Sequence, residues 1–159
     1  MLPIRRILCP TDFSERSLHA FNVACALARD YGAHLLVLHV RPSPRGGQEV
    51  SDLIRDPEEV RQGVLQKLQS LRADDPSIEV ERLLKTGDAA REIAHTARET
   101  GSDVIVMGTH GHTALARLLL GSVAEAVLRE AHCPVFMIKA PFPEDAKHAP
   151  GAATGTAGH

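Results

Sequence analysis

Residues 103–139 read DVIVMGTHGHTALARLLLGSVAEAVLREAHCPVFMIK. This stretch begins with the mostly apolar run 103–107 and ends with a second one, 134–139. Apolar residues that follow one another without alternation are typical of parallel strands covered on both faces. Between the runs lie a glycine-containing loop, 108–121, and a helical pattern over 123–131. The stretch therefore predicts two parallel strands joined through a loop and a helix.

The same alternation extends back to the N-terminus. Short apolar runs predict strands at 4–9, 34–40 and 78–84, and apolar residues at helical spacing follow each of them. The complete order is β-α-β-α-β-α-β-α-β, which favours an α/β domain with a parallel sheet and helices on both of its faces. The crossovers of such a sheet are expected to be right-handed.

Several helix ends have local signals. Gly32 stands where a helix over 14–31 needs a left-handed C-terminal residue. Asp56 is predicted to be the N-cap of the second helix, and Asp88 that of the third. Gly101 is expected to end the third helix.

The composition is that of one domain with little net charge. The chain has 159 residues and a formal net charge of -2, so neither nucleic acid nor an anionic membrane is an expected partner. No run of about 18 apolar residues occurs, and the first apolar run is too short for a signal peptide, which predicts a cytoplasmic protein. Cys9, Cys25 and Cys133 lack CxxC spacing and favour reduced structural thiols over a zinc or redox site.

Two segments have the composition of loops. Residues 41–55 hold prolines and glycines and predict a loop, which serves either as a lid over a ligand or as a plain insertion. Residues 141–159 are rich in Ala and Gly and predict a disordered tail. The folded domain is therefore expected to span residues 1–140.

Two strand ends have residues suited to binding a ligand. In an open parallel sheet, ligands bind beyond the carboxyl ends of the strands, where the strand order reverses. Pro10-Thr11-Asp12 follows the first strand, and the pattern G-x2-G-x9-G-S follows the run 103–107. Glycines let backbone N–H groups approach a phosphate, and a helix N-terminus adds unpaired N–H groups and a positive dipole end. The pattern is neither a Walker A loop nor the G-x-G-x-x-G fingerprint.

Each of these motifs also has a purely structural explanation. Asp12 suits the N-cap of the first helix as well as a ligand contact, and Ser122 suits the first position of an S-x-x-E capping box. The glycines alone would also suit a tight turn. A zinc site at His110 and His112 would need two more ligands, for which His39 is the one candidate, so loop histidines without a metal are the favoured interpretation.

Taken together, the motifs resemble the nucleotide-binding branch of the universal stress protein family. The resemblance covers about the first 140 residues and rests on ILCPTDFSE (7–15), LLVLHV (35–40), TGDAAREI (86–93) and above all the segment 106–139. It implies a three-layer α/β/α fold of the Rossmann-like, adenine nucleotide α-hydrolase-like type, with five parallel strands in the order 3-2-1-4-5. It also implies ATP as the ligand, bound together with Mg²⁺.

The resemblance implies roles for particular residues. Asp12 is expected to meet the ribose or the bound metal ion. Pro10 and Thr11 would shape the wall near the adenine, and the backbone of Val40 would meet the adenine edge. His112 stands where many relatives have a basic residue, which predicts weaker and more pH-dependent binding. The residues expected along the phosphates and ribose are Met107, Gly108, His110, Gly111, Gly121, Ser122 and Val123.

The last strand, 134–139, predicts a partner. In the implied order it is an edge strand, yet its apolar side chains point to both faces, and an exposed edge of this kind invites pairing with another chain. A twofold homodimer, joined through this strand in each copy, would cover the edge.

The leading hypothesis is a homodimeric, ATP-binding regulator of the stress response, whose nucleotide state an unidentified partner reads. No obvious base for hydrolysis is visible, which predicts a slow ATPase at most. The main alternative is a nucleotide-free homodimeric interaction protein of the same fold. A third hypothesis, an adenylating enzyme, would need a substrate domain for which the chain has little room.

Overall fold

The computed structural model describes residues 3–43, 57–109 and 120–139, which form a five-stranded parallel sheet between two layers of helices. The strand order is β3-β2-β1-β4-β5, and each neighbouring pair is parallel, so the predicted fold and strand order are confirmed. The elements in chain order are β1 (Arg6–Pro10), α1 (Glu15–Tyr31), β2 (His34–Arg41), α2 (Pro57–Ser70), β3 (Val80–Thr86), α3 (Ala89–Glu99), β4 (Val104–Gly108), α4 (Ser122–Glu130) and β5 (Val135–Ile138).

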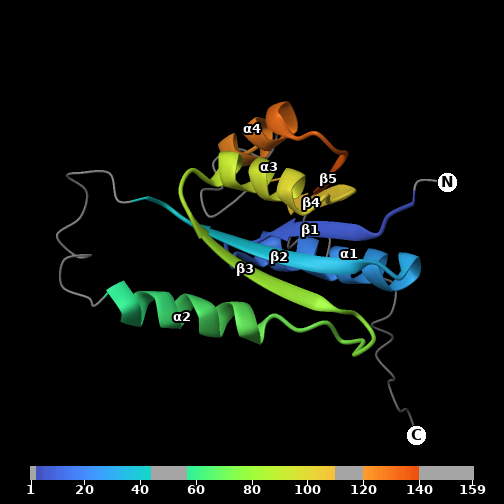
Figure 1. Cartoon of the computed structure of the whole chain (residues 1–159), viewed down its shortest axis with the longest axis horizontal. Helices are drawn as coiled ribbons and strands as arrows, with labels where there is room; N and C mark the ends of the chain where they lie inside the picture. Colours follow the sequence, from blue (N-terminus) through green and yellow to red (C-terminus); the bar gives the residue numbers. More distant parts are fainter. Residues whose placement is uncertain (1–2, 44–56, 110–119, 140–159) are drawn as a thin grey trace, which may run out of the picture.

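The helices divide between the two faces of the sheet. One core lies under α1 and α2 and includes Ile7 and Val37, whereas the other lies under α3 and α4 and includes Leu8 and Leu38. Figure 1 shows α3 and α4 side by side above the strands and α2 on the opposite side. Because adjacent residues of β1 and β2 face opposite cores, both strands are buried on both faces, as their unbroken apolar sequences predict.

Most of the predicted helix ends are confirmed. Gly32 has φ 61°, and its N–H bonds back to the end of α1. Asp88 is the N-cap of α3, with its side chain accepting from the N–H of Arg91, and Gly101 follows the helix with φ 61°. Asp56, most of the predicted loop 41–55 and the tail 141–159 lie outside the described residues.

The third strand begins two residues later than predicted, at Val80. A turn at Asp75 takes up the intervening residues: its Oδ1 accepts from Ser77 N at 2.9 Å, and its carbonyl accepts from Ile78 N at 3.2 Å. Hydrogen bonds from the hydroxyl and the N–H of Ser77 to the carboxylate lower the pKa of Asp75. Because the backbone of Ile78 closes this turn, the strand starts only after it.

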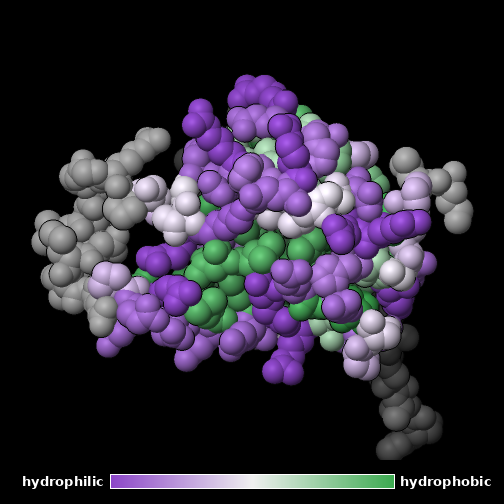
Figure 2. Space-filling model, viewed as in Figure 1, coloured by the Kyte–Doolittle hydropathy of each residue, from purple (hydrophilic) through white to green (hydrophobic). Residues whose placement is uncertain are grey.

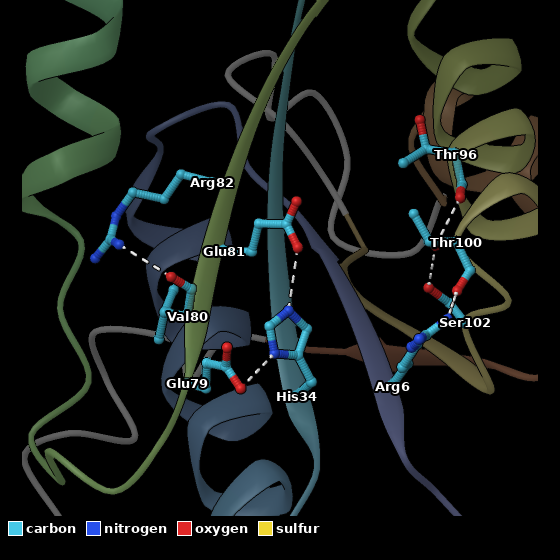
Figure 3. Close-up of polar contacts among 9 residues, drawn as sticks. All are labelled: Arg6, His34, Glu79, Val80, Glu81, Arg82, Thr96, Thr100 and Ser102. Carbon is cyan, nitrogen blue, oxygen red and sulfur yellow. Dashed lines mark hydrogen bonds and ion pairs between the residues drawn. The ribbon is translucent and has the colours of Figure 1, made fainter.

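Polar side chains link the strands where they begin (Figure 3). His34, the first residue of β2, has one ring nitrogen 3.2 Å from a carboxylate oxygen of Glu79 and the other 3.2 Å from one of Glu81. Arg6, the first residue of β1, donates from Nη1 to the carbonyl of Thr100 at the end of α3, at 2.6 Å. The amino-terminal edge of the sheet is therefore held by side-chain contacts between neighbouring elements.

Apolar surface gathers over β2 and β3, between α2 and α3 (Figure 2). On the edge strand β3, Leu83 packs against the core under α3 and α4, and Leu84 packs against the core under α1 and α2, although both remain partly exposed. Directly before them, Arg82 donates to the carbonyls of Leu68 and Leu71 at the end of α2, at 2.9 and 2.6 Å. Both cores thus extend to this edge, and Arg82 ties α2 to it.

The three cysteines are free thiols in apolar surroundings. Burial raises the pKa of Cys9, and it raises that of Cys25 to about 11. Burial also raises the pKa of Cys133. Thiols whose ionised form is disfavoured in this way are poor nucleophiles and metal ligands.

Within the three described ranges, no helix combines the length and the apolar content that a membrane crossing requires.

Candidate functional site

A crevice opens at the carboxyl edge of the sheet, between β1 and β4. The pairing of β1 with β2 continues to Pro10 and Leu38, but its pairing with β4 stops at Leu8 and Ile105. Thr11 N donates to Leu38 O on the β2 side, so the preceding residue, Pro10, points its nitrogen towards β4. Proline has no N–H, and the next rung to β4 cannot form. The two strands separate at the point where the strand order reverses.

The crevice holds a cavity of about 290 Å³, and the structure brings nine of the eleven predicted site residues to its wall. His110 and Gly111 lie outside the described residues and remain predictions. The nine residues at the wall are Pro10, Thr11, Asp12, Val40, Met107, Gly108, Gly121, Ser122 and Val123. Seven further residues line the cavity without having been assigned to it from the sequence: Ser17, Leu38, His39, Ala89, Ile93, Thr109 and Ala124.

The residues that sequence reasoning missed include two from the start of α3, Ala89 and Ile93. The two motifs assigned to the ligand follow the strands predicted at 4–9 and 103–107 and do not include this helix, although TGDAAREI (86–93), which contains both residues, contributed to the family resemblance. An available signal was the position of α3 directly after β3, because every helix that follows a parallel strand starts at the carboxyl edge. Ile93 is 3% exposed, so it serves the core as well as the cavity wall.

The wall contributed by β2 ends in backbone groups that point into the crevice. Successive residues of a strand direct their N–H and C=O groups to opposite neighbours. Leu38 O accepts from Thr11 N on the β1 side at 2.8 Å, and Arg41 O accepts from Gly87 N on the β3 side at 2.9 Å. Val40 therefore directs its N–H and C=O to the β1 side, beyond the last β1–β2 pair. Among the described residues, no backbone group pairs with Val40 on that side.

The opposite end of the cavity is formed by the N-terminus of α4. The N-cap is Gly121, and among the described residues no side-chain hydrogen bond caps the helix. The predicted capping box is therefore wrong in its register, because Ser122 already lies in the first turn of α4. Gly121 N donates to Thr109 O at 2.8 Å, which fixes the start of the helix to the end of β4. The first turn thus presents unpaired N–H groups and the positive end of the helix dipole beside the cavity.

The two described glycines of the loop motif have different reasons to be glycine. Gly121 has φ -62° and ψ 151°, a conformation that any residue adopts, so its backbone does not require glycine. At Gly108, a Cβ atom would lie 3.3 Å from the carbonyl oxygen of Arg16 in α1. Gly108 therefore allows α1 to pack closely on the end of β4, a role that differs from both sequence interpretations, a phosphate contact and a tight turn.

Asp12 does not cap α1, contrary to one of the two sequence interpretations. The N-cap is Ser14, whose hydroxyl oxygen accepts from Ser17 N at 3.2 Å. Asp12 lies two residues earlier, and its Oδ1 accepts from the N–H of Ser14 at 3.0 Å and from the Ser14 hydroxyl at 2.5 Å. The carboxylate is thereby held at the cavity wall, directly before the helix.

Two titratable side chains line the described part of the cavity, Asp12 and His39. His39 Nδ1 lies 2.7 Å from the carbonyl oxygen of Thr11. A carbonyl only accepts hydrogen bonds, so Nδ1 has the proton. Residues 3–43, 57–109 and 120–139 contain no cluster of three His, Cys, Asp or Glu side chains arranged for a metal ion.

The fold and the site together define a class of protein. A parallel sheet with helices on both faces, with a cavity at the reversal of strand order and a helix N-terminus beside it, is the arrangement of Rossmann-like α/β domains.

Comparison with known proteins identifies the family. The model of the universal stress protein family matches residues 3–139, so the chain belongs to that family. Universal stress protein MJ0531 of Methanocaldococcus jannaschii is 34% identical over 148 residues, which cover 88% of this chain and 85% of that protein.

Solved structures show the same fold. Protein MJ0577, also of M. jannaschii, has a TM-score of 0.70 to this chain at 28% identity, with 87% of this chain and 98% of that one covered. The universal stress protein from Archaeoglobus fulgidus in complex with dAMP has a TM-score of 0.60 at 25% identity, with 87% and 100% covered.

Proposed function

We propose that the protein is a homodimeric, ATP-binding regulator of a stress response in the cytoplasm. The observation that supports this ligand most directly is the N-terminus of α4, which has a glycine N-cap, has no side-chain cap and borders the cavity. A helix N-terminus of this kind suits phosphate groups. The A. fulgidus relative, which was solved with dAMP, supports an adenine nucleotide.

The residues of the cavity fit ATP and Mg²⁺ in their chemistry. At one end, Val40 offers a backbone donor and acceptor for a base, and at the other end the first turn of α4 offers N–H groups for phosphates. The cavity volume, about 290 Å³, is at the small end of the range for small-molecule sites. Asp12 would hold Mg²⁺, because this ion is commonly bound by one or two carboxylates together with phosphate oxygens. The bound ion would offset phosphate charge.

Slow hydrolysis, or none, is expected from the same residues. Hydrolysis needs a group that orients the attacking water. His39 uses Nδ1 to donate to Thr11, and Asp12 accepts two hydrogen bonds from Ser14. These bonds give both titratable side chains of the described wall a structural role, and measured turnover tests whether either of them also orients water. We expect nucleotide binding to shift a conformational equilibrium that a partner protein reads.

The proposed dimer would form through β5. This strand is at the edge of the sheet, and its Phe136 is 39% exposed. Leu128 and Val123 of α4 are also exposed, so three of the five large apolar side chains that are exposed in the described part of the chain belong to α4 or β5. A second copy of the chain would cover the open edge together with Phe136 and Leu128, whereas Val123 also lines the cavity.

Mass spectrometry of small molecules released from freshly purified, then denatured protein tests the ligand class. We expect an adenine nucleotide, and we expect a fluorescent ATP analogue to bind the emptied protein. If no analogue binds at millimolar concentration, the nucleotide-free interaction protein becomes the better description. Turnover of several ATP molecules per second would contradict the regulatory role, and a monomer in light scattering would contradict the dimer.

A further inference from the structure

The hydrogen-bond ladder between β1 and β2 stops one rung earlier than its geometry allows. Its last backbone bond joins Thr11 N to Leu38 O. In a regular parallel ladder, the next rung would join Val40 N–H to the carbonyl of Thr11. That rung is missing, although both residues belong to the cavity wall.

The side chain of His39 forms a hydrogen bond with the carbonyl oxygen of Thr11, which is the acceptor that this rung would use. Nδ1 of His39 donates to Thr11 O at 2.7 Å, which is a short N–H···O distance. A carbonyl oxygen can accept two hydrogen bonds, but in the described residues Thr11 O accepts from the imidazole and receives none from the N–H of Val40. Because Val40 lies at the crevice, its N–H and C=O remain together as one donor and one acceptor directed at the cavity.

Phe13 keeps the imidazole of His39 in this position. Its ring centroid lies 4.6 Å from that of His39, and Lys67 of α2 places its Nζ 5.7 Å from the Phe13 ring. Phe13 has φ 63°, a left-handed conformation that bulky residues rarely adopt. Its N–H donates to Thr11 Oγ1 at 3.1 Å, which helps to hold this turn. Backbone strain that several contacts maintain is concentrated at functional sites.

We propose that His39 is a positioning residue for the base of the bound nucleotide. By fixing the direction of the Thr11 carbonyl towards its own ring, it keeps β1 from pairing with Val40 and leaves the Val40 N–H and C=O available to the ligand. This inference rests on the proposed nucleotide function. The pair complements the edge of adenine, where a ring nitrogen accepts a hydrogen bond and the neighbouring amino group donates one.

Amide hydrogen exchange measured by NMR on the nucleotide-free protein tests the first half of this proposal. We expect the Val40 amide to exchange rapidly in the wild type. In His39→Phe, which keeps an aromatic ring against Phe13 but has no donor, the Thr11 carbonyl is released and Val40 N–H closes the missing rung. Its exchange should slow by about tenfold, as one added hydrogen bond allows. A protected Val40 amide in the wild type, or an unchanged one in a folded His39→Phe, overturns the inference.

Ligand binding tests the second half, with the base and the phosphates separated. Calorimetry with adenosine should show about tenfold weaker binding to His39→Phe, the value of one hydrogen bond, whereas binding of inorganic tripolyphosphate should not change. His39→Gln, whose amide can still donate to Thr11, should bind adenosine nearly as the wild type does. Equal losses for both ligands, or no loss for adenosine, would overturn the positioning role.

The two proposals fail in different ways. If the wild type binds neither adenosine nor ATP, the proposed function fails, while the exchange of the Val40 amide still reports on what His39 does to the ladder. If ATP binds normally but the Val40 amide is protected without ligand, only the role of His39 is lost. Should His39→Phe not fold, the wild-type exchange measurement and His39→Gln decide the question.

Discussion

The helices α1 and α4 both start at the carboxyl edge of the sheet, yet their N-termini differ. The first turn of α1 is closed by its own side chains: the Ser14 hydroxyl accepts from Ser17 N, and Asp12 accepts from Ser14. The first turn of α4 follows Gly121 and has no side-chain cap. Each helix also has an acidic residue in its first turn, Glu15 and Glu125, which suits the positive end of its dipole.

This difference separates structural from ligand-binding roles along one edge. A helix N-terminus whose N–H groups are already bonded gains little from a ligand, whereas one without a cap needs water or a ligand to satisfy them. The third helix, α3, resembles α1, because Asp88 caps it. Of the three helix starts that the structure describes with their caps, α4 is the one whose N-cap residue has no side chain to accept from the first turn, although Ala89 of α3 also lines the cavity.

The largest effect is expected from closing the α4 N-terminus with a branched side chain. Gly121→Val should weaken ATP binding by about 100-fold or more, because two hydrogen bonds to charged phosphate oxygens contribute about 1.5–3 kcal/mol each. The backbone angles of Gly121 suit valine, so the fold should persist. Equilibrium binding of a fluorescent ATP analogue measures the loss, and thermal unfolding checks the fold.

Gly121→Ala is the graded control for this experiment and should give an intermediate loss. Normal ATP affinity in a folded Gly121→Val protein would show that phosphates do not bind at α4. The difference between the N-termini of α1 and α4 would then concern helix capping only and would not indicate where a ligand binds.

A smaller effect, on stability, is expected at the glycine that faces α1. In Gly108→Ala the new methyl group would lie only 3.3 Å from the carbonyl oxygen of Arg16. This close contact should lower the free energy of unfolding by about 1–3 kcal/mol. At Gly63, in the middle of α2, a methyl group would meet no other atom within 4 Å, and Gly63→Ala should stabilise by about 0.5–1 kcal/mol. Urea unfolding measures both. Equal stability of the two variants would argue against close packing of α1 on β4.

The smallest effect is expected from opening the α1 N-terminus. Ser14→Ala should lower the free energy of unfolding by about 1 kcal/mol, because the N–H of Ser17 loses its acceptor. ATP affinity measured without Mg²⁺ should stay close to that of the wild type, since α1 is not assigned to the phosphates, whereas the effect of Mg²⁺ should weaken because Asp12 loses the bond from the Ser14 hydroxyl. The reciprocal change, Gly121→Asp, should raise stability by a few tenths of a kcal/mol and weaken ATP binding, because its carboxylate would take the free N–H groups. A strong loss of ATP affinity in Ser14→Ala alone would contradict the division of roles.

Local patterns predict the helix ends well where a single residue decides them. Gly32 and Asp88 are identifiable because a left-handed C-terminal residue and an N-cap are properties of the chain within one turn. For α1 and α4, the predicted N-caps lie one or two residues away from the true ones. Around both starts, Ser, Asp and Gly occur close together, and several registers satisfy the same capping pattern.

The order and type of the elements and the motif at the carboxyl edge could be predicted from the chain alone, and family resemblance added the strand order. These properties depend on periodicity and on residues that are close in the chain. Three other features became visible only in the folded molecule: Gly108 makes room for Arg16, Pro10 separates β1 from β4, and His39 bonds to Thr11. Each of them depends on the distance between atoms that the chain brings together only when the sheet forms, and no local pattern contains that distance.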